Sequence, residues 1–276
     1  MRAALLQMTS GIDPAANAAT IVAAVREAKA GGADMLFTPE MSGLLDRDRQ
    51  RAAAHLRGEA DDIVLAAVRE AAEDAGLWVH IGSLALAGER EDGRLVNRGF
   101  VIDDSGAIRA RYDKMHLFDV DLATGESWRE SAVYAPGEAP SLARTPWGGV
   151  GMSVCYDLRF AELYRTLSDG GATILTVPAA FTVPTGQAHW HLLLRARAVE
   201  SACFVIAAAQ WGRHEDGRET YGHSLVIDPW GEVLLDMGEG TGVGFADLDP
   251  TRIEDVRARV PVLRHRRVIP ALENGT

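Results

Sequence analysis

The stretch VGMSVCYDLRF, residues 150–160, places a cysteine where an apolar run meets polar sequence. Residues 150–154 predict a short buried strand that ends at Cys155. In open α/β sheets, ligands bind beyond the carboxyl ends of the strands. A helix that starts just after Cys155 would also direct backbone N–H groups toward a developing oxyanion. Position therefore makes Cys155 a candidate nucleophile, while a buried structural cysteine stays open as the alternative. Cys203, inside the apolar run SACFVIAAA, fits the structural alternative well.

Strand and helix patterns alternate on both sides of this stretch. Helices are expected at 14–33, 62–76, 159–171, 188–202 and 251–260, and strands at 3–8, 77–86, 172–178 and 203–209. Residues 34–40 are expected to form a short buried strand that runs into a loop. Segments 97–114 and 224–237 have the pattern of hairpins. Alternating elements with added hairpins predict an α/β fold with mixed sheets. Because no linker or repeat interrupts the pattern, we expect a single domain over residues 1–276.

Composition excludes several classes of function. The 276-residue chain has a net charge of −11, which opposes nucleic-acid binding. Its basic cluster, RHRR at 264–267, is better explained by a solvated tail or an interface contact. Two cysteines without CxxC spacing form neither a disulfide framework nor a cysteine-based metal site. The N-terminal apolar run is too short for a signal peptide, and no run reaches transmembrane length. We expect a cytoplasmic protein that binds neither membranes nor nucleic acids.

A nucleophilic cysteine needs a basic partner, and two other charged residues are expected at strand ends. Glu40 ends the run MLFTPE, and Lys114 ends the predicted strand IRARYDK. None of the candidate histidines stands clearly at a strand end; these are His116, His189, His191, His214 and His223. Each strand-end charge alone is more simply a solvated surface residue. Whether Glu40, Lys114 and Cys155 converge is left open by these patterns.

Three short motifs carry a resemblance to a known family. The segments FTPE, YDKMHLFD and VCYDLRF resemble the Glu-Lys-Cys motifs of the nitrilase superfamily, the carbon–nitrogen hydrolases. The similarity runs over about residues 2–268, and later segments such as YGHSLVIDPWGEV resemble its Nit branch of amidases. The resemblance implies an α-β-β-α sandwich that pairs into a homodimer or higher homo-oligomer. It also implies that the C-terminal tail, about residues 261–276, lies at the subunit interface.

The resemblance also implies a role for each matching residue. Cys155 would be the nucleophile and Glu40 the general base, while Lys114 and the backbone N–H of Tyr156 would stabilise the oxyanion. An ordinary cysteine has a pKa of about 8.5 and an ordinary glutamate about 4.3. We therefore expect burial to raise the pKa of Glu40 toward that of the thiol. Glu130, in the segment WRES, would position Lys114 and the substrate.

The substrate implied is a small amide with an acid group. Arg159 could bind a carboxylate through two parallel hydrogen bonds, although an ion pair with Asp157 or Glu162 is the simpler alternative. Phe181 and Thr182 resemble the family segment that lines the pocket, and would supply an apolar wall and a hydrogen bond. Segment 207–224 resembles the Nit branch that hydrolyses deaminated glutathione. The favoured function is thus a cysteine-dependent amidase for deaminated glutathione, and the alternative is an ω-amidase for 2-oxoglutaramate.

Other readings compete with the cysteine amidase. His116, Asp119 and Asp121 in HLFDVD could bind a metal, but hydrolytic zinc sites usually use His-rich sets such as HExxH, which are missing from this sequence. A nitrile substrate or a binding protein without hydrolysis also fits the fold. We expect no metal and no cofactor. Ammonia release that withstands a chelator but not iodoacetamide would distinguish the cysteine enzyme from both alternatives.

Overall fold

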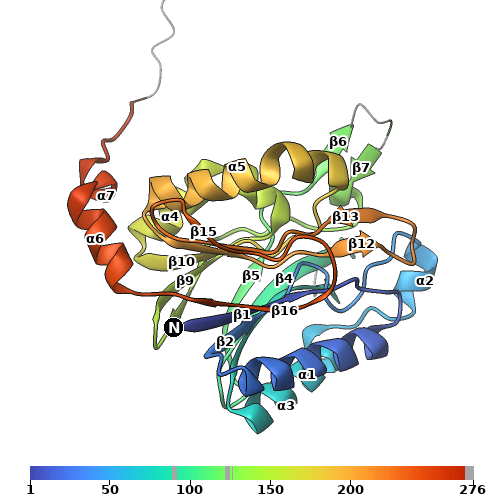
Figure 1. The fold of residues 1–276 in the computed structure, drawn as a ribbon. Coiled ribbons are helices and arrows are strands. Elements are labelled where there is room, and N and C mark those ends of the chain that lie inside the picture. Colours follow the sequence, from blue (N-terminus) through green and yellow to red (C-terminus); the bar gives the residue numbers. More distant parts are fainter. Residues whose placement is uncertain (89–91, 122–124, 126, 271–276) are drawn as a thin grey trace, which may run out of the picture.

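The computed structural model describes residues 1–88, 92–121, 125 and 127–270, and its centre is two six-stranded sheets (Figure 1). The first sheet has the order β16-β1-β2-β3-β4-β5. β1, β2 and β3 are parallel, whereas β16 and β4 are antiparallel to their neighbours and β5 is antiparallel to β4. The strands of this sheet are β1 (Arg2–Gln7), β2 (Met35–Phe37), β3 (Trp78–Ala87), β4 (Leu95–Ile102), β5 (Ile108–Asp113) and β16 (Gly242–Asp247).

The second sheet has the order β15-β14-β11-β10-β9-β8 and is also mixed. Its central strands β9, β10 and β11 are parallel, and antiparallel strands lie on both flanks. Its strands are β8 (Ser141–Thr145), β9 (Gly148–Met152), β10 (Ala172–Thr176), β11 (Phe204–Ala207), β14 (Leu225–Ile227) and β15 (Val233–Asp236). The predicted α/β fold with mixed sheets is therefore confirmed.

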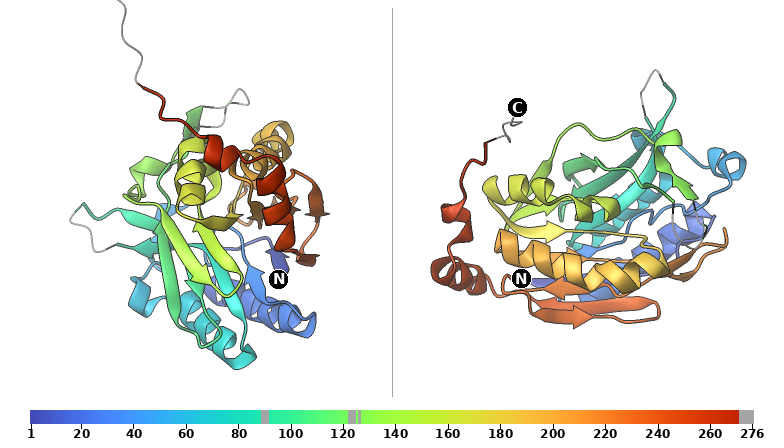
Figure 2. Two further views of the ribbon diagram at one scale, coloured as in Figure 1. Left: turned by 90° about the vertical axis from the view of Figure 1, so that its left-hand side faces the viewer. Right: turned by 90° about the horizontal axis from the view of Figure 1, so that it is seen from above.

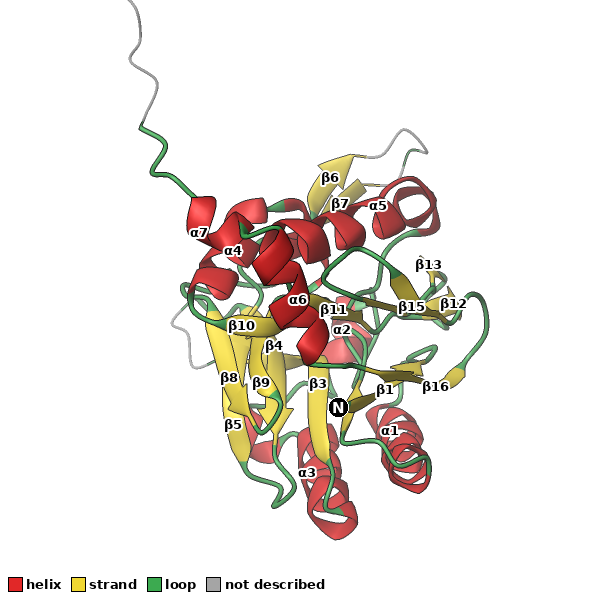
Figure 3. Ribbon diagram, turned by 60° about the vertical axis from the view of Figure 1, so that its left-hand side comes forward, coloured by secondary structure: helices red, strands yellow, loops and turns green. Residues whose placement is uncertain are grey.

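Helices cover the outer face of each sheet, as Figures 1 and 3 show. α1 and α3 pack on the first sheet, and α4 and α5 pack on the second. The α-helices are α1 (Pro14–Ala30), α2 (Arg49–Ala53), α3 (Ile63–Ala75), α4 (Ala161–Asp169), α5 (Val183–Ser201), α6 (Thr251–Arg259) and α7 (Val262–His265). Three short 3-10 helices are η1 (Glu59–Asp61), η2 (Glu130–Ala132) and η3 (Cys155–Arg159). This layering is the α-β-β-α sandwich that the resemblance implies.

Successive residues of a strand point to opposite faces of the sheet, and in the first sheet both faces are covered. On β1, Ala3 and Leu5 belong to the core between the sheets, whereas Ala4 and Leu6 belong to the core under α1 and α3. A strand with apolar residues at consecutive positions suits such a doubly covered sheet. The two cores fix the sheets rigidly, so loops at the strand ends can hold side chains in defined positions.

Two small hairpins and a C-terminal extension complete the structure. β6 (Asp119–Asp121) pairs with β7 (Ser127–Arg129), and β12 (Trp211–Arg213) pairs with β13 (Glu219–Tyr221). α6, α7 and residues 266–270 extend along one end of the sandwich beside α4 (Figure 2). Residues 271–276 of the predicted interface tail lie outside the described residues. Across the described chain, none of the helices combines the length and apolar character needed to cross a bilayer.

Several predicted boundaries were wrong. Residues 34–40 form the expected short strand, Met35–Phe37, followed by the loop that carries Glu40, but other boundaries differ. The predicted helix 188–202 begins earlier, at Val183, with Pro184 in its first turn. The segment just after Cys155 is a 3-10 helix, and the α-helix starts only at Ala161. The strand at 150–154 is β9, which ends at Met152.

Candidate active site

The predicted strand-end residues meet at one edge of the sandwich. Glu40 follows β2 and Lys114 follows β5 in the first sheet, and these two strands run in the same direction. Cys155 follows β9 in the second sheet. All three side chains are buried and line one cavity. The sheet-to-sheet packing therefore brings together residues that are far apart in the sequence.

Cys155 occupies a strained turn. Its φ angle is 51°, in the left-handed region that residues other than glycine rarely adopt, at a cost of about 1–3 kcal/mol. The Cys155 N–H donates to the carbonyl of Pro178 at 2.9 Å. The N–H of Tyr156, in contrast, has no acceptor among the described residues. The turn thus leaves a free backbone donor next to the Cys155 sulfur.

Asp157 fixes this turn to the loop that carries Lys114. Its fully buried carboxylate accepts hydrogen bonds from Val154 N at 2.8 Å and Tyr112 Oη at 2.7 Å. It also accepts from His116 N at 3.0 Å, and its Oδ1 lies 2.6 Å from His116 Nδ1. Hydrogen bonds to an ionised acceptor are stronger than neutral ones. Asp157 therefore positions the nucleophile turn, and His116 is bound to it rather than grouped with Asp119 and Asp121.

Lys114 lies between two carboxylates. Its Nζ is 2.9 Å from Glu40 Oε1, and 3.0 and 2.8 Å from the two oxygens of Glu130. Asn97 on β4 donates from Nδ2 to Glu40 Oε1 at 3.0 Å and to Glu130 Oε1 at 3.3 Å. The N–H of Phe118 donates to Glu130 Oε2 at 2.6 Å. The Lys114 side chain is only 2% exposed, so these contacts fix it in a nearly dry environment.

The loop of Glu40 is held from three sides. Glu40 Oε2 accepts from the N–H of Ala180 at 3.0 Å, and Gln210 Nε2 donates to the Glu40 carbonyl at 2.9 Å. β3 passes beneath this loop at Gly82. A Cβ atom at Gly82 would lie 2.2 Å from the Thr38 carbonyl oxygen and 2.4 Å from Pro178 Cβ. Only glycine lets the three segments approach this closely.

The charges of these groups depend on one another. Burial raises the pKa of Glu40, but the Lys114 charge and hydrogen bonds from Cys155, Lys114 and Asn97 outweigh it and lower the pKa below its ordinary value. Burial and the negative charge of Glu40 raise the pKa of the Cys155 thiol well above its usual range. Burial lowers the pKa of Lys114, but the charges of Glu130 and Glu40 reverse this and raise it well above normal. The expected rise in the pKa of Glu40 was therefore wrong. The resting site holds a neutral thiol, a carboxylate and an ammonium.

A cavity of about 580 Å³ opens over these residues. This volume is within the range of small-molecule sites. Its lining includes the predicted site residues Glu40, Lys114, Glu130, Cys155, Tyr156, Phe181 and Thr182. Arg159 is not among the lining residues. Its guanidinium carbon lies 5.8 Å from the ring of Tyr156 and 5.7 Å from that of Phe181, and its nearest polar partner is His189 Nδ1 at 3.4 Å. The alternative ion pair of Arg159 with Asp157 or Glu162 is absent among the described residues.

The sequence patterns missed three groups that hold the site: Asn97, Asp157 and Gln210. Asn97 lies within an expected strand, and Asp157 was considered only as polar sequence after Cys155 and as an ion-pair partner of Arg159. A separate cluster of His191, His223 and Asp236 lies outside the cavity, with the two rings bound to the same carboxylate at 3.0 and 2.9 Å. Cys203 is fully buried beside the carbonyl of Ala172, as expected of a structural cysteine.

The fold and site can be compared with known proteins. The deaminated glutathione amidase of Yersinia enterocolitica is 38% identical over 270 residues, covering 98% of this chain and 94% of that protein. The deaminated glutathione amidase of Homo sapiens is 40% identical over 269 residues, covering 96% and 81%. Among solved structures, Nit3 of Saccharomyces cerevisiae, a member of branch 10 of the nitrilase superfamily, has a TM-score of 0.87 at 27% identity over 97% of both chains. An amidase from Nesterenkonia sp. has a TM-score of 0.79 at 29% identity over 95% of both chains.

A family model described as carbon-nitrogen hydrolase matches residues 2–258. The matched range includes the two sheets, the four helices that cover them, and the cavity residues Glu40, Lys114, Glu130 and Cys155. With this match and relatives similar over nearly the whole length, the chain belongs to the carbon–nitrogen hydrolase family.

Proposed function

We propose that this protein is a cysteine-dependent amidase that works through a thioester. The Cys155 sulfur attacks the amide carbon as its proton passes to Glu40. The tetrahedral intermediate collapses by breaking the C–N bond, and the amine leaves with that proton. Glu40 then takes a proton from water, which attacks the thioester carbon and releases the acid. The thiol regains its proton from Glu40, so the site returns to its starting state.

The charge pattern carries this proposal. The pKa of Glu40 is lowered and its negative charge helps to raise the pKa of the Cys155 thiol, so an ionised base faces a protonated nucleophile. Lys114 keeps its positive charge and, with the N–H of Tyr156, can stabilise the oxyanion. Glu130 holds Lys114 in place from the other side. In a variant of the Nesterenkonia sp. AN1 amidase, acrylamide has added at the active-site cysteine. This fits a nucleophilic role for Cys155.

For the substrate we propose deaminated glutathione, an amide whose acyl part is 2-oxoglutarate and whose amine part is cysteinylglycine. The names of the Yersinia enterocolitica and Homo sapiens relatives support this choice. The cavity of about 580 Å³ also extends well beyond the triad. Within it, Phe181 and Thr182 are proposed to contact the acyl chain. Arg159, behind the rings of Tyr156 and Phe181, is proposed to attract the 2-oxo acid carboxylate.

The test measures 2-oxoglutarate release from deaminated glutathione and from 2-oxoglutaramate on one preparation, beside Cys155→Ala and Arg159→Ala. We expect a higher kcat/KM for deaminated glutathione, no turnover by Cys155→Ala, and a raised KM in Arg159→Ala. A ratio that favours 2-oxoglutaramate would make the protein an ω-amidase instead. An unchanged KM in Arg159→Ala would remove the carboxylate contact from the proposal.

We also propose that the protein is a homodimer in the cytoplasm, with one domain per chain. Apolar side chains on α5 and in the tail are exposed, Leu192 to 68% and Val268 to 94%. Arg266 holds the tail against α4 and α5 through Ser168 and the Glu200 carbonyl. A second subunit would cover this surface. Light scattering of the protein and of Leu192→Glu tests it, because a monomer in both cases would contradict the assembly.

A further inference from the structure

The cavity lining carries arginine side chains that the proposed chemistry of Glu40, Lys114 and Cys155 does not use. Arg47, Arg49, Arg129 and Arg218 line the cavity together with the acidic residues Asp46 and Glu219. The whole chain, in contrast, has a net charge of −11. Asp46 is bound to Arg51 at 2.6 Å and Arg129 to Asp121 at 2.9 Å, so these two lining charges already have partners.

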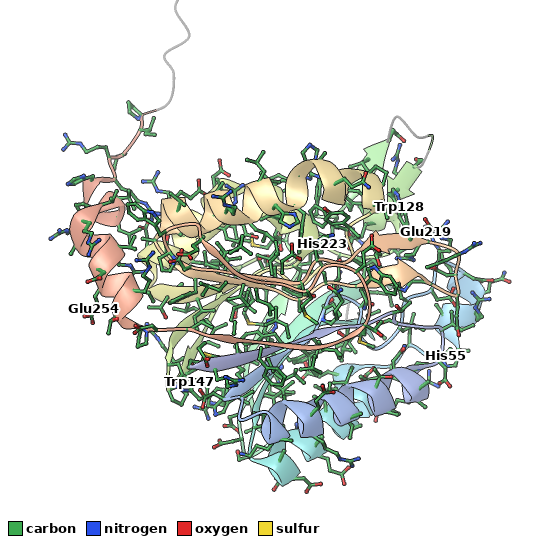
Figure 4. The ribbon with its side chains drawn as sticks, in the orientation of Figure 1. His55, Trp128, Trp147, Glu219, His223 and Glu254 are labelled. Atoms are coloured by element: carbon green, nitrogen blue, oxygen red, sulfur yellow. The ribbon has the colours of Figure 1, made fainter. Side chains whose placement is uncertain are left out.

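The guanidinium groups of Arg47 and Arg218 both lie close to the indole ring of Trp128. The guanidinium carbons of Arg47 and Arg218 lie 5.2 and 5.3 Å from the ring centroid of Trp128 on β7. Trp128 and Glu219 are labelled at this end of the molecule in Figure 4. Such contacts attract a cation to the ring and fix the direction of a flexible side chain. The indole N–H of Trp128 is buried and has no partner among the described residues.

The carboxylate of Asp216 contacts both Arg47 and Arg218. Its side chain is fully buried, and its Oδ2 accepts from Arg218 Nε at 2.7 Å and from Arg47 N at 3.0 Å. The same oxygen is 3.9 Å from Arg47 Nε. One carboxylate thus faces two guanidiniums, which leaves one positive charge unbalanced within this set. Arg218 is 18% exposed and Arg47 is 50% exposed, so both can be reached from the cavity.

We infer that Arg47 and Arg218 bind a carboxylate on the amine part of the substrate. This rests on the proposed function. In the proposed function the acyl part contacts Phe181 and Thr182, which leaves the amine part to extend along the cavity lining that carries Arg47 and Arg218. Deaminated glutathione loses cysteinylglycine, which ends in a carboxylate, whereas 2-oxoglutaramate loses only ammonia. Guanidinium groups suit a carboxylate because their paired donors match its two oxygens. The pair would therefore select amides with an acidic, peptide-like leaving group.

The experiment compares deaminated glutathione with its C-terminal N-methylamide, and follows 2-oxoglutarate release in both cases. Capping removes the charge at the amine end and leaves the scissile bond unchanged. A carboxylate held by two charge-assisted contacts is worth about tenfold or more in kcat/KM. We expect capping to lower kcat/KM by about that factor, mainly through KM.

Three variants test whether Arg47 and Arg218 cause the effect of capping on kcat/KM. Arg47→Gln removes an exposed guanidinium while its backbone contact with Asp216 can persist, and Arg218→Lys keeps a cation beside the buried Asp216. We expect both to lower kcat/KM for deaminated glutathione and to reduce the effect of capping. Arg49→Gln is the matched control. Arg49 also lines the cavity and carries the same charge, but among the described residues it has no contact with Trp128 or Asp216. The control variant should retain the full effect of capping.

Failure of the two proposals gives different results. If no 2-oxoglutarate is released from deaminated glutathione, the proposed function is wrong. If deaminated glutathione is hydrolysed but capping changes kcat/KM by less than about twofold, only the carboxylate subsite is wrong. An equal loss of the capping effect in Arg47→Gln and Arg49→Gln would also overturn the subsite, because a general positive potential would then explain the selectivity.

Discussion

Replacing Lys114 with methionine removes a buried cation and keeps most of the side-chain volume. Because the proposed role of the ammonium is to stabilise charge in the transition state, kcat should fall far more than KM rises. Loss of one oxyanion donor typically costs about 10²–10³ in kcat. Lys114 contributes a full charge at 2% exposure, so the loss should lie at or above the upper end of that range.

The same substitution should change stability and the pH profile. It leaves Glu40 and Glu130 buried without their shared cation, which for a broken buried ion pair costs about 3–5 kcal/mol in the free energy of unfolding. In the native protein the Lys114 charge and the hydrogen bonds keep the pKa of Glu40 below its ordinary value, against the effect of burial. Without Lys114, burial dominates and the pKa of Glu40 rises. The acid limb of kcat/KM should therefore move to higher pH.

The assay combines urea unfolding with kcat and KM for deaminated glutathione across the pH range in which the variant stays folded. Lys29→Met is the matched control, because Lys29 is the other lysine of the chain and lies exposed on α1, where it donates to the Gly76 carbonyl. Near-normal kcat with a raised KM would mean that Lys114 binds substrate and does not stabilise the oxyanion. An acid limb that stays in place would refute the role of Lys114 in the ionisation of Glu40.

Three further results are expected. Cys155→Ala should lose all turnover with an unchanged unfolding curve, and activity above a blank purification would assign the nucleophile to another residue. Gly82→Ala should lower both kcat and stability, because its Cβ would meet the Thr38 and Pro39 carbonyls at 2.2 and 2.5 Å; normal kinetics would show that the loop of Glu40 adjusts freely. Burial lowers the pKa of His80 to about 3, so the unfolded chain binds more protons between pH 6.5 and 3 and stability should fall as pH falls through that window. His80→Phe should flatten this dependence in urea titrations, and an unchanged slope would assign it to other groups.

The layers of the fold could be predicted because their signals are local. The helix at Pro14–Ala30 ends at Gly31, and the helix at Ile63–Ala75 ends at Gly76 in the left-handed conformation, as the glycine positions indicate. Apolar runs such as that of β10 mark strands buried on both faces. Short polar strands were missed, among them β6 and β7, because their pairing depends on a partner strand and not on their own pattern.

The positions of the candidate site residues could be predicted, but not how they are held. Strand ends drew attention to Glu40, Lys114 and Cys155, and the family motifs supplied their roles. Asn97 lies midway along β4, where nothing in the local sequence distinguishes it from a structural asparagine. Its contacts with Glu40 and Glu130 depend on the register of β4 against β5, which pairs Arg98 with Asp113 and so carries Lys114 beside Asn97. Register depends on pairing between strands, and a one-residue shift would destroy the contacts of Asn97.

The charge state of the site depends on a balance that only geometry reveals. Burial alone predicts a raised pKa for Glu40, and that expectation proved wrong because Lys114 and three hydrogen bonds act on the same carboxylate. The result matters for the chemistry. A glutamate with a raised pKa would be a stronger base and would share the proton of the thiol at rest, whereas the lowered pKa of Glu40 leaves that proton on the sulfur. In the proposed mechanism, the negative charge that raises the pKa of Cys155 is also the charge that removes its proton during attack. A buried, neutral thiol is also less exposed to oxidation than a resting thiolate. In the proposed mechanism, formation of the nucleophile is therefore coupled to the arrival of the substrate.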